Sequence, residues 1–572
     1  MSHWKSTKRG INPVGRPPLQ SAMTSLFCLA AVFFLLFYGL GDRSLAGSED
    51  RWAEIARNML LHKDWFHPVI NGEIYFDKPL LSYWLIVLAA LCTQALNEFA
   101  VRLPGAIAGL LTLICSYQIA VAWFDRRIAW LSVCLIITSY GFLFWTHTAS
   151  AELSNLALIT AAVAWFVPRR ERTDFTAYAV FYLLCAIGSQ LKGLTAFVVP
   201  LLVIAPFVLR DGRWKMHVNL SHLGALVLAA GLFLLPYLGA SMLALPAGIE
   251  VQHNHLSGLE LLIRENLVRF FEPFDHVDPF YSYVYEVPRI VFPWSLFLLA
   301  GLAYYLPRYA TLDQSRRWLL EAIALVFLFF TLSGSRRWYY ILPIMPFCMI
   351  MIAAYLAEPD EHRWRRPATL ATLFLLGAAA VFLIAIPGAA HLYPASPSLP
   401  LEFWIASVVT LVGGAVIAWL GQGRTAILHR VIGIDTALAR YFLPIILLLS
   451  ALEMTVIFGL VLPGADRYRQ RKPFALALAR QLNSDETLVF YKRPNTTLVF
   501  YLNPGDPIPV ISNKSEISKY GNKWVIVADE IDKEGLFKEF PELRYSTRLL
   551  EPERISKNLF SDKSNLVAYR PN

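Results

Sequence analysis

The stretch Leu80-Leu-Ser-Tyr-Trp-Leu-Ile-Val-Leu-Ala-Ala-Leu-Cys-Thr-Gln-Ala-Leu96 decides how this chain is arranged, because it is apolar enough to be counted as a membrane span. A transmembrane helix needs about 20 largely apolar residues. If this stretch crosses the membrane, every loop after it changes sides. The choice therefore fixes which polar residues can share one site.

About thirteen other apolar stretches lie on either side of it, and each is long enough to form a span. Of 572 residues, 56% are hydrophobic and only 16% are charged, and the mean hydropathy is +0.47. Such values are typical of an integral membrane protein. The predicted spans lie near residues 21–41, 103–122, 128–146, 151–167, 175–190, 193–209, 219–245, 288–306, 318–333, 338–357, 367–387, 402–420 and 440–463.

Basic residues decide the side on which each loop lies, because Lys and Arg collect on the cytoplasmic side of a membrane. With the basic N-terminus inside and Leu80–Leu96 on the outer side, the later basic clusters all lie inside; counting Leu80–Leu96 as a span sends them all outside. We therefore expect a helix at the outer interface, anchored by Tyr83 and Trp84. A genuine span is the alternative. The later clusters are Arg126/Arg127, Arg169/Arg170/Arg172, Arg210/Arg213/Lys215, Arg308/Arg316/Arg317, Arg363/Arg365/Arg366 and Arg424/Arg430.

The composition makes several classes of partner unnecessary. The net charge of +9 is largely explained by the cytoplasmic arginines, so no nucleic-acid partner is expected. The six cysteines all lie in apolar runs, which predicts neither a disulfide framework nor a cysteine metal site. The first apolar stretch is longer than the core of a signal peptide and lacks a small-residue cleavage site, so we expect it to remain as an anchor.

The composition changes at Gly464 and stays polar to the end, which predicts a soluble α/β domain over residues 464–572 after a membrane domain over residues 1–463. Arg471–Leu482 has the spacing of a helix. Three runs are rich in β-forming residues: Thr487–Tyr491, Thr497–Tyr501 and Trp524–Ala528. An odd number of spans places this domain outside, and its sequence shows no catalytic motif.

Two long outer loops, over residues 42–102 and 246–287, are expected to carry the chemistry, because long loops in a compact protein are usually functional or disordered. In the first loop, Glu49, Asp50 and Glu54 place carboxylates near the outer end of the first span. The alternative is that they favour the positive end of a helix or form its solvated face.

Other charged residues mark the outer ends of later spans. Glu152 begins an apolar span, where an ionisable residue costs free energy and is a functional candidate; alternatively, Ser150 caps the helix and Glu152 only favours its positive end. Lys192, Arg336 and Arg337 run against the positive-inside trend. Such residues are natural partners of phosphate oxygens, and snorkelling to lipid headgroups is the alternative.

The second long loop adds Glu265, Asn266 and Arg269. Three histidines lie there as well: His253, His255 and His276. They could bind a divalent metal, but isolated histidines more often make ordinary hydrogen bonds. The sequence requires no cofactor and leaves a divalent metal open.

Together these residues predict a site for displacing a phosphate. The predicted catalytic carboxylates are Glu49, Asp50 and Glu152. The predicted ligands of the donor phosphate are Lys78, Lys192, Arg269, Arg336, Arg337 and Tyr340. The predicted substrate-binding residues are Arg51, Trp52, Glu54, Tyr75, Asp77, Glu265, Asn266, His276 and Tyr339.

The order and spacing of short motifs along nearly the whole chain resemble the polytopic GT-C glycosyltransferases, and within them the ArnT-like group. The matching stretches are Arg51–Ile55, Phe76–Pro79, Asn97–Pro104, Lys192–Gly193, Asn266–Phe270, Pro293–Trp294 and Tyr340–Pro343. The resemblance implies transfer of 4-amino-4-deoxy-L-arabinose from undecaprenyl phosphate to lipid A, at the periplasmic face of the bacterial inner membrane. It also implies juxtamembrane helices in the first outer loop, in agreement with the placement of Leu80–Leu96.

The chain departs from the family at the acidic pair of the first loop, which there reads D-E-x-R-Y. Alignment on the following arginine puts Ser48 where the aspartate stands. The catalytic carboxylate is therefore open between Glu49 and Asp50, and Glu49 is favoured because it keeps its own alignment position. Glu152 stands where the family has aspartate, and Asp77 replaces the commoner glutamate. These changes are compatible with a different sugar or acceptor.

The expected reaction is an inverting single displacement. Polyprenyl phosphate is a good leaving group, so basic residues need only hold it and neutralise its developing charge. A hydroxyl acceptor needs a general base, whereas a lipid A phosphate, with a second pKa of about 6, is largely ionised and needs only positioning.

The expected partners of the chain, which we expect to be a monomer, are the lipid-linked sugar, the lipid acceptor and membrane lipids. A transferase acting on protein or glycan hydroxyls is the closer rival, and a lipid transporter or flippase is the rival of another class. Against the latter, the ionisable residues lie at one face and not near the middle of the bilayer.

Overall fold

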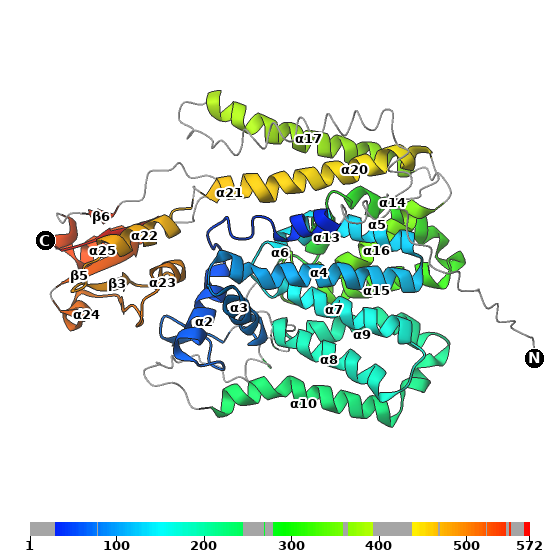
Figure 1. Ribbon diagram of the computed structural model, residues 1–572, viewed down its shortest axis with the longest axis horizontal. Helices are drawn as coiled ribbons and strands as arrows, with labels where there is room; N and C mark the ends of the chain where they lie inside the picture. Colours follow the sequence, from blue (N-terminus) through cyan, green and yellow to red (C-terminus); the bar gives the residue numbers. More distant parts are fainter. Residues whose placement is uncertain are drawn as a thin grey trace, which may run out of the picture.

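The computed structural model is a bundle of long helices joined to a small β-sheet (Figure 1). The sheet lies at one end of the molecule, and α2 and α3 lie between it and the bundle. The described residues are 29–76, 78–243, 263, 268, 271, 278–358, 364–392, 437–466, 469–521, 523–544, 548–550 and 565–571.

Helices lie within every predicted span that the described residues include. They are 29–37, α4 (Glu98–Trp123), α5 (Arg126–Ile137), α6 (Tyr140–Thr146), α7 (Glu152–Phe166), α8 (Phe175–Lys192), α9 (Thr195–Leu209), α10 (Leu220–Met242), α13 (Ser282–Ile290), α14 (Ser295–Tyr305), α15 (Gln314–Leu332), α16 (Met345–Ala357), α17 (Arg365–Leu392), α20 (Ala437–Val456) and α21 (Leu462–Ala465). By length and composition, four helices of the described part can cross a membrane, or up to six if each bent pair is one span. The predicted span 402–420 lies outside the described residues, so the total of thirteen stays a prediction.

Local signals explain where these helices begin. Five of them start after an Asn or Asp whose side chain accepts a hydrogen bond from a backbone N–H three residues later, as expected of an N-cap. These caps are Asn97, Asp125, Asp174, Asn219 and Asp313. The helix α16 is apolar all round and lies buried along nearly its whole length, which is the behaviour expected of a central helix.

The decisive stretch forms α3 (Leu81–Thr93), a helix of 13 residues. At 1.5 Å per residue this is about 20 Å, shorter than a hydrocarbon core of about 30 Å. The helix α16, which lies in a predicted span, also has 13 residues, so the placement of Leu80–Leu96 outside the spans stays a prediction. It packs against α4, α8 and the helix α2 (Glu49–His62) of the first outer loop. The predicted role of Tyr83 as an interfacial anchor is wrong: the residue is 2% exposed and packs on Trp52, with ring centroids 4.9 Å apart.

The C-terminal segment forms a five-stranded sheet in the order β4-β3-β5-β7-β6. The strands β4, β3 and β5 are parallel, and β7 is antiparallel to both β5 and β6. The strands are β3 (Thr487–Tyr491), β4 (Val510–Ile511), β5 (Trp524–Asp529), β6 (Arg548–Leu550) and β7 (Leu566–Tyr569). The flanking helices are α22 (Arg471–Gln481), α23 (Thr496–Leu502), α24 (Lys514–Ile517) and α25 (Lys533–Glu539).

The predicted strand at Thr497–Tyr501 is wrong, because these residues lie in α23. Asn495 caps this helix by accepting a hydrogen bond from the N–H of Leu498 at 3.1 Å. The residues Thr497 to Phe500 are all buried between the sheet and the first outer loop. An N-cap and burial on both sides outweigh the β-propensity of Thr, Val, Phe and Tyr.

Candidate active site

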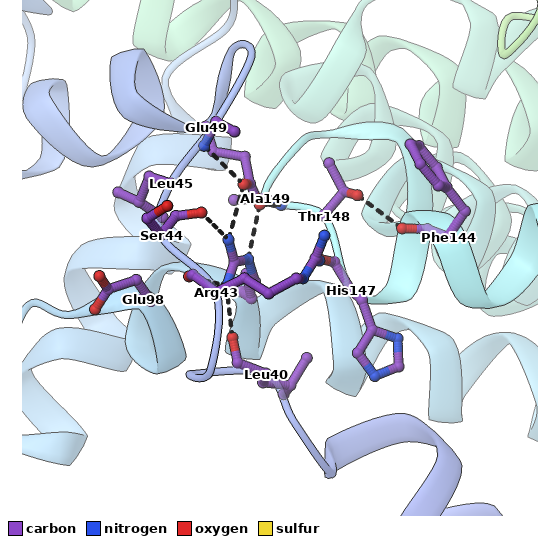
Figure 2. A network of polar contacts seen from close by, with 12 residues as sticks. Leu40, Arg43, Ser44, Leu45, Glu49, Glu98, Phe144, His147, Thr148 and Ala149 are labelled. Atoms are coloured by element: carbon purple, nitrogen blue, oxygen red, sulfur yellow. Dashed lines mark hydrogen bonds and ion pairs between the residues drawn. The ribbon is translucent and has the colours of Figure 1, made fainter. Parts of the chain in front are cut away.

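Glu49, the first residue of α2, is held in a buried ion pair. Its two carboxylate oxygens accept hydrogen bonds from Nε and Nη2 of Arg102, both at 2.8 Å, and the backbone N–H of Ala149 donates to it at 2.9 Å. Arg102 is fully buried. Its remaining hydrogens go to the carbonyls of the turn before α2, so Leu40, Ser44, Glu49 and Ala149 gather in one polar network (Figure 2).

The electrostatics of this pair make Glu49 a weak base. Burial alone would raise its pKa, but the charge and hydrogen bonds of Arg102 and the charge of Arg43 outweigh burial and lower the pKa to about 2. A general base works best with a pKa near the working pH. The catalytic role of Glu49 therefore stays a prediction. The geometry shows that Glu49 holds Arg102 in a buried ion pair.

Asp50 and Glu54 lie on the side of α2 that faces the C-terminal segment. Thr497 of α23 donates to Asp50 at 2.7 Å, and Arg57 and Asn58 both donate to Glu54 at 2.7 Å. Burial raises the pKa of both carboxyl groups. Asp50 is therefore part of the contact between the first loop and the C-terminal segment, and Glu54 holds Arg57, which donates to the carbonyl of Pro504 at 2.9 Å.

Glu152 and Lys192 form the charged centre on the side of the bundle. Glu152 begins α7 and Lys192 ends α8, and the two side chains are joined by an ion pair. The ammonium of Lys192 lies 5.3 Å and 4.7 Å from the ring centroids of Tyr339 and Tyr340. The charge of Lys78 also acts on Glu152. Five predicted site residues, from four separate parts of the chain, therefore come together here.

A small pocket adjoins this centre. Its wall includes Lys78 and residues of α8 and α10, and most of the rest is apolar. The lining residues are Phe76, Lys78, Pro79, Leu80, Gln190, Pro236, Tyr237 and Ala240. Gln190 and Tyr237 carry no signal in the sequence, because each lies in an apolar span and the packing of α8 against α10 brings them to Lys78.

Two other predicted site residues, Arg51 and Arg336, form hydrogen bonds elsewhere in the chain. Arg51 donates to the hydroxyl of Tyr75, which ties α2 to the segment between the short strand β2 (Glu73–Ile74) and Lys78. Arg336 donates to the carbonyls of Asp278, at 2.8 Å, and of Ser333, so it holds the chain after α15. Its role in binding a phosphate stays a prediction. Predicted residues that lie outside the described part are Asp77, Glu265, Asn266, Arg269 and His276.

No group of three or more His, Cys, Asp or Glu side chains that could hold a metal is present within the described residues. The predicted histidine ligands of the second long loop fall outside them.

Comparisons with known proteins agree with this arrangement. A family model described as dolichyl-phosphate-mannose-protein mannosyltransferase matches residues 21–246. An undecaprenyl phosphate-α-4-amino-4-deoxy-L-arabinose arabinosyl transferase of Pseudomonas aeruginosa (strain LESB58) is 28% identical over 425 residues, which are 69% of this chain and 71% of that protein. The transferase of the same name from Aeromonas salmonicida (strain A449) is 30% identical over 376 residues, 63% of this chain and 66% of that one.

A solved structure shows the same fold. The crystal structure of ArnT from Cupriavidus metallidurans bound to undecaprenyl phosphate matches with a TM-score of 0.70 and 20% identity, over 96% of this chain and 98% of that one. The helical membrane fold and these relatives define a glycosyltransferase of the GT-C class, an enzyme that uses a lipid-linked sugar. Within that class the chain belongs to the ArnT-like group.

Proposed function

We propose that the enzyme transfers 4-amino-4-deoxy-L-arabinose from undecaprenyl phosphate to a phosphate of lipid A, at the periplasmic face of the inner membrane. The observation that carries the proposal is the cluster of Glu152, Lys192, Lys78 and Tyr340 at the ends of separate helices. The names of its relatives give the lipid-linked donor and the sugar, and the alignments cover 69% and 63% of this chain. The acceptor and the side of the membrane are part of the proposal.

The reaction follows from the charges in this cluster. An oxygen of the acceptor attacks the anomeric carbon, the bond from that carbon to the donor phosphate oxygen breaks, and both bonding electrons leave with undecaprenyl phosphate. Lys78 and Lys192 neutralise the charge that develops on the leaving phosphate. The hydroxyl of Tyr340 is the neutral donor beside them.

Glu152 keeps Lys192 oriented through their ion pair. A phosphate acceptor is already ionised, so it needs no base, and a carboxylate beside it needs cations in between. A hydroxyl acceptor would instead need Glu152 as the general base. Glu49 is the weaker candidate for that base, because it is bound to Arg102 and its pKa is lowered.

We propose the membrane topology that the charge pattern of the sequence predicts. We place thirteen spans within residues 1–463, the loops 42–102 and 246–287 in the periplasm, and residues 464–572 beside them as a periplasmic α/β domain. A monomer suffices for this chemistry, because the cluster is made by one chain.

Mass spectrometry of lipid A tests the proposal. Lipid A should carry a mass of one aminopentose on its phosphates in cells that make the protein, and this mass should vanish in cells that lack it or carry Glu152→Gln. Unchanged lipid A in all three, together with turnover of the lipid-linked donor in membranes, would give the sugar a different acceptor. No turnover of the donor at all would reject the proposed donor.

A further inference from the structure

The side chain of Gln190 is fixed in one orientation. It lies in the last turn of α8, is only 6% exposed, and donates a hydrogen bond from Nε2 to the carbonyl of Phe233 in α10. A carbonyl oxygen can only accept, so the nitrogen of the amide must face Phe233. The amide oxygen of Gln190 is thereby left to face elsewhere.

Among the residues that the structure describes, that oxygen has no hydrogen-bond partner. Oε1 of Gln190 is buried there, and Gln190 lines the small pocket that also contains Lys78. A buried acceptor without a partner costs free energy, so such groups in folded proteins normally meet a donor, including one supplied by a ligand.

The pocket lies next to the charged centre. Lys78 lines the pocket and acts on Glu152, while Gln190 stands only two residues before Lys192 on the same helix. Two residues along a helix correspond to nearly opposite faces. Gln190 therefore contacts α10 and Lys192 contacts Glu152, while Lys78 is common to both sites, because it lines the pocket and its charge acts on Glu152.

We propose that Gln190 is a specificity-determining residue for the transferred sugar. Its amide oxygen accepts a hydrogen bond from a hydroxyl or ammonium group on the sugar ring, while Lys78 in the same pocket holds the donor phosphate. The pocket is small, so it takes one substituent of the ring, and Phe76 and Tyr237 give that substituent an aromatic wall. This inference rests on the proposed function, because it needs a lipid-linked sugar as the donor.

A hydrocarbon chain cannot donate a hydrogen bond to Oε1 of Gln190. The isoprene units of the lipid carry no hydrogen-bond donor, so a lipid tail in the pocket would leave Oε1 of Gln190 unpartnered. The sugar is the part of the donor with hydroxyl or amino hydrogens. The chemistry of the pocket thus selects the sugar over the tail.

The test compares variants in purified full-length enzyme reconstituted in lipid vesicles. Gln190→Leu removes the acceptor and keeps a similar volume, and Gln190→Glu keeps an oxygen in the pocket and adds a negative charge. Ser189→Ala is the matched control, because the hydroxyl of Ser189 donates to the carbonyl of Cys185 in its own helix at 2.8 Å, and Ser189 is not among the described residues that line the pocket. The probes are undecaprenyl phosphate-aminoarabinose, undecaprenyl phosphate-arabinose and undecaprenyl phosphate without a sugar.

We expect Gln190→Leu to lower kcat/KM for the sugar-linked donor by about ten- to a hundred-fold, as for one lost hydrogen bond. The inhibition constant of undecaprenyl phosphate should stay within about two-fold, because it carries no sugar. If Gln190→Glu keeps or raises kcat/KM for the amino sugar but not for arabinose, the partner is the ammonium; equal values for both sugars make it a hydroxyl.

Other outcomes overturn the inference. Equal weakening of undecaprenyl phosphate and of the sugar-linked donor would make Gln190 part of the lipid site or of the fold. Unchanged kinetics in Gln190→Leu would remove it from the sugar site. A wild-type enzyme that neither binds undecaprenyl phosphate nor turns over its sugar conjugates would instead defeat the proposed function, which separates the two failures.

Discussion

At the scale of single residues, the Glu49–Arg102 pair is predicted to stabilise the fold more than it serves the reaction. Glu49→Gln leaves the guanidinium of Arg102 buried without its counter-charge, and breaking a buried pair in this way costs about 3–5 kcal/mol. The apparent free energy of unfolding in detergent measures this loss. Substitution of both residues, as Glu49→Gln with Arg102→Met, should recover part of it, and a stable Glu49→Gln protein without turnover would return Glu49 to the mechanism.

The Glu49–Arg102 pair is also predicted to stabilise the folded protein less as the pH falls. The pKa of Glu49 is lowered from 4.5 to about 2 in the folded protein. A carboxyl with a lowered pKa stabilises the fold above its ordinary pKa, and this stabilisation is lost as pH falls from about 4.5 towards 2. Linkage puts the loss at about 3 kcal/mol. Thermal unfolding between pH 6 and 3 should show a fall that is smaller in Glu49→Gln.

The ion pair of Glu152 and Lys192 is predicted to be essential for turnover. Lys192→Met removes a charge that stabilises the leaving phosphate, and such electrostatic groups are worth about 10²–10³ in kcat. Glu152→Gln should lower kcat by a similar factor, and Glu152→Asp should recover part of it. Initial rates with the lipid-linked donor give the result. Full activity of Lys192→Met at saturating donor would contradict its role at the phosphate.

Part of this site could be predicted from residue types and their spacing in the sequence. Glu152 and Lys192 were visible because charges at the ends of apolar spans are rare, and the structure does bring them together with Lys78 and the two tyrosines. Gln190 was invisible because a neutral amide in an apolar span has no such signal. The partner of Glu49 was also invisible, since Arg102 lies 53 residues away in a different helix.

At the scale of elements, the contact of α23 with α2 is predicted to depend on the hydroxyl of Thr497. Burial raises the pKa of Asp50, while the hydrogen bond from Thr497 and the charges of Arg51 and Arg471 lower it; the like charge of Glu54 faces it on the same helix. Thr497→Val removes the hydrogen bond, so the pKa of Asp50 rises further and the charged form becomes more costly. We expect a loss of about 2 kcal/mol at pH 7.

The destabilisation caused by Thr497→Val is expected to depend on pH. A carboxyl with a raised pKa makes folding less favourable as pH rises from its ordinary value of 3.8 towards the raised one. The difference in unfolding temperature between Thr497→Val and wild type should therefore be larger at pH 7 than at pH 4. Thr497→Ser keeps the hydroxyl and is the control. A difference that is equal at both pH values would make the loss one of packing.

Elements were predicted well where one strong physical signal acts alone. The apolar runs of the bundle gave helices, whereas the placement of α3 outside the spans rests on the charge pattern alone and stays a prediction. The stretch at Thr497–Tyr501 was misassigned because its β-forming side chains compete with an N-cap and with burial against α2, and the second of these depends on tertiary structure.

At the scale of the whole molecule, the sheet has its own apolar clusters, and its junction with the bundle combines the apolar contact of Phe500 with several polar contacts. The two apolar clusters of the sheet contain only residues from 474 to 569. Across the junction, Asp466 accepts from Ser44 at 2.7 Å, and Tyr501 donates to Glu98 at 2.8 Å and accepts from the N–H of Leu45 at 2.8 Å. Disruption of the junction should therefore separate the two parts without unfolding either.

The double substitution Asp466→Asn with Tyr501→Phe is predicted to loosen this junction. Hydrogen exchange followed by mass spectrometry should show faster exchange in α2, which loses its support from α23, while β3 and β5 stay protected because their own core is intact. Turnover of the lipid-linked donor should fall as well, because Tyr75 and Lys78 follow α2 in the same loop. Lys523→Ala is the control, because Lys523 pairs with Asp485 on the exposed surface of the sheet. Equal loss of protection in α2 and in β5 would show that the junction is part of one cooperative core, and unchanged exchange in α2 would show that apolar packing alone holds it.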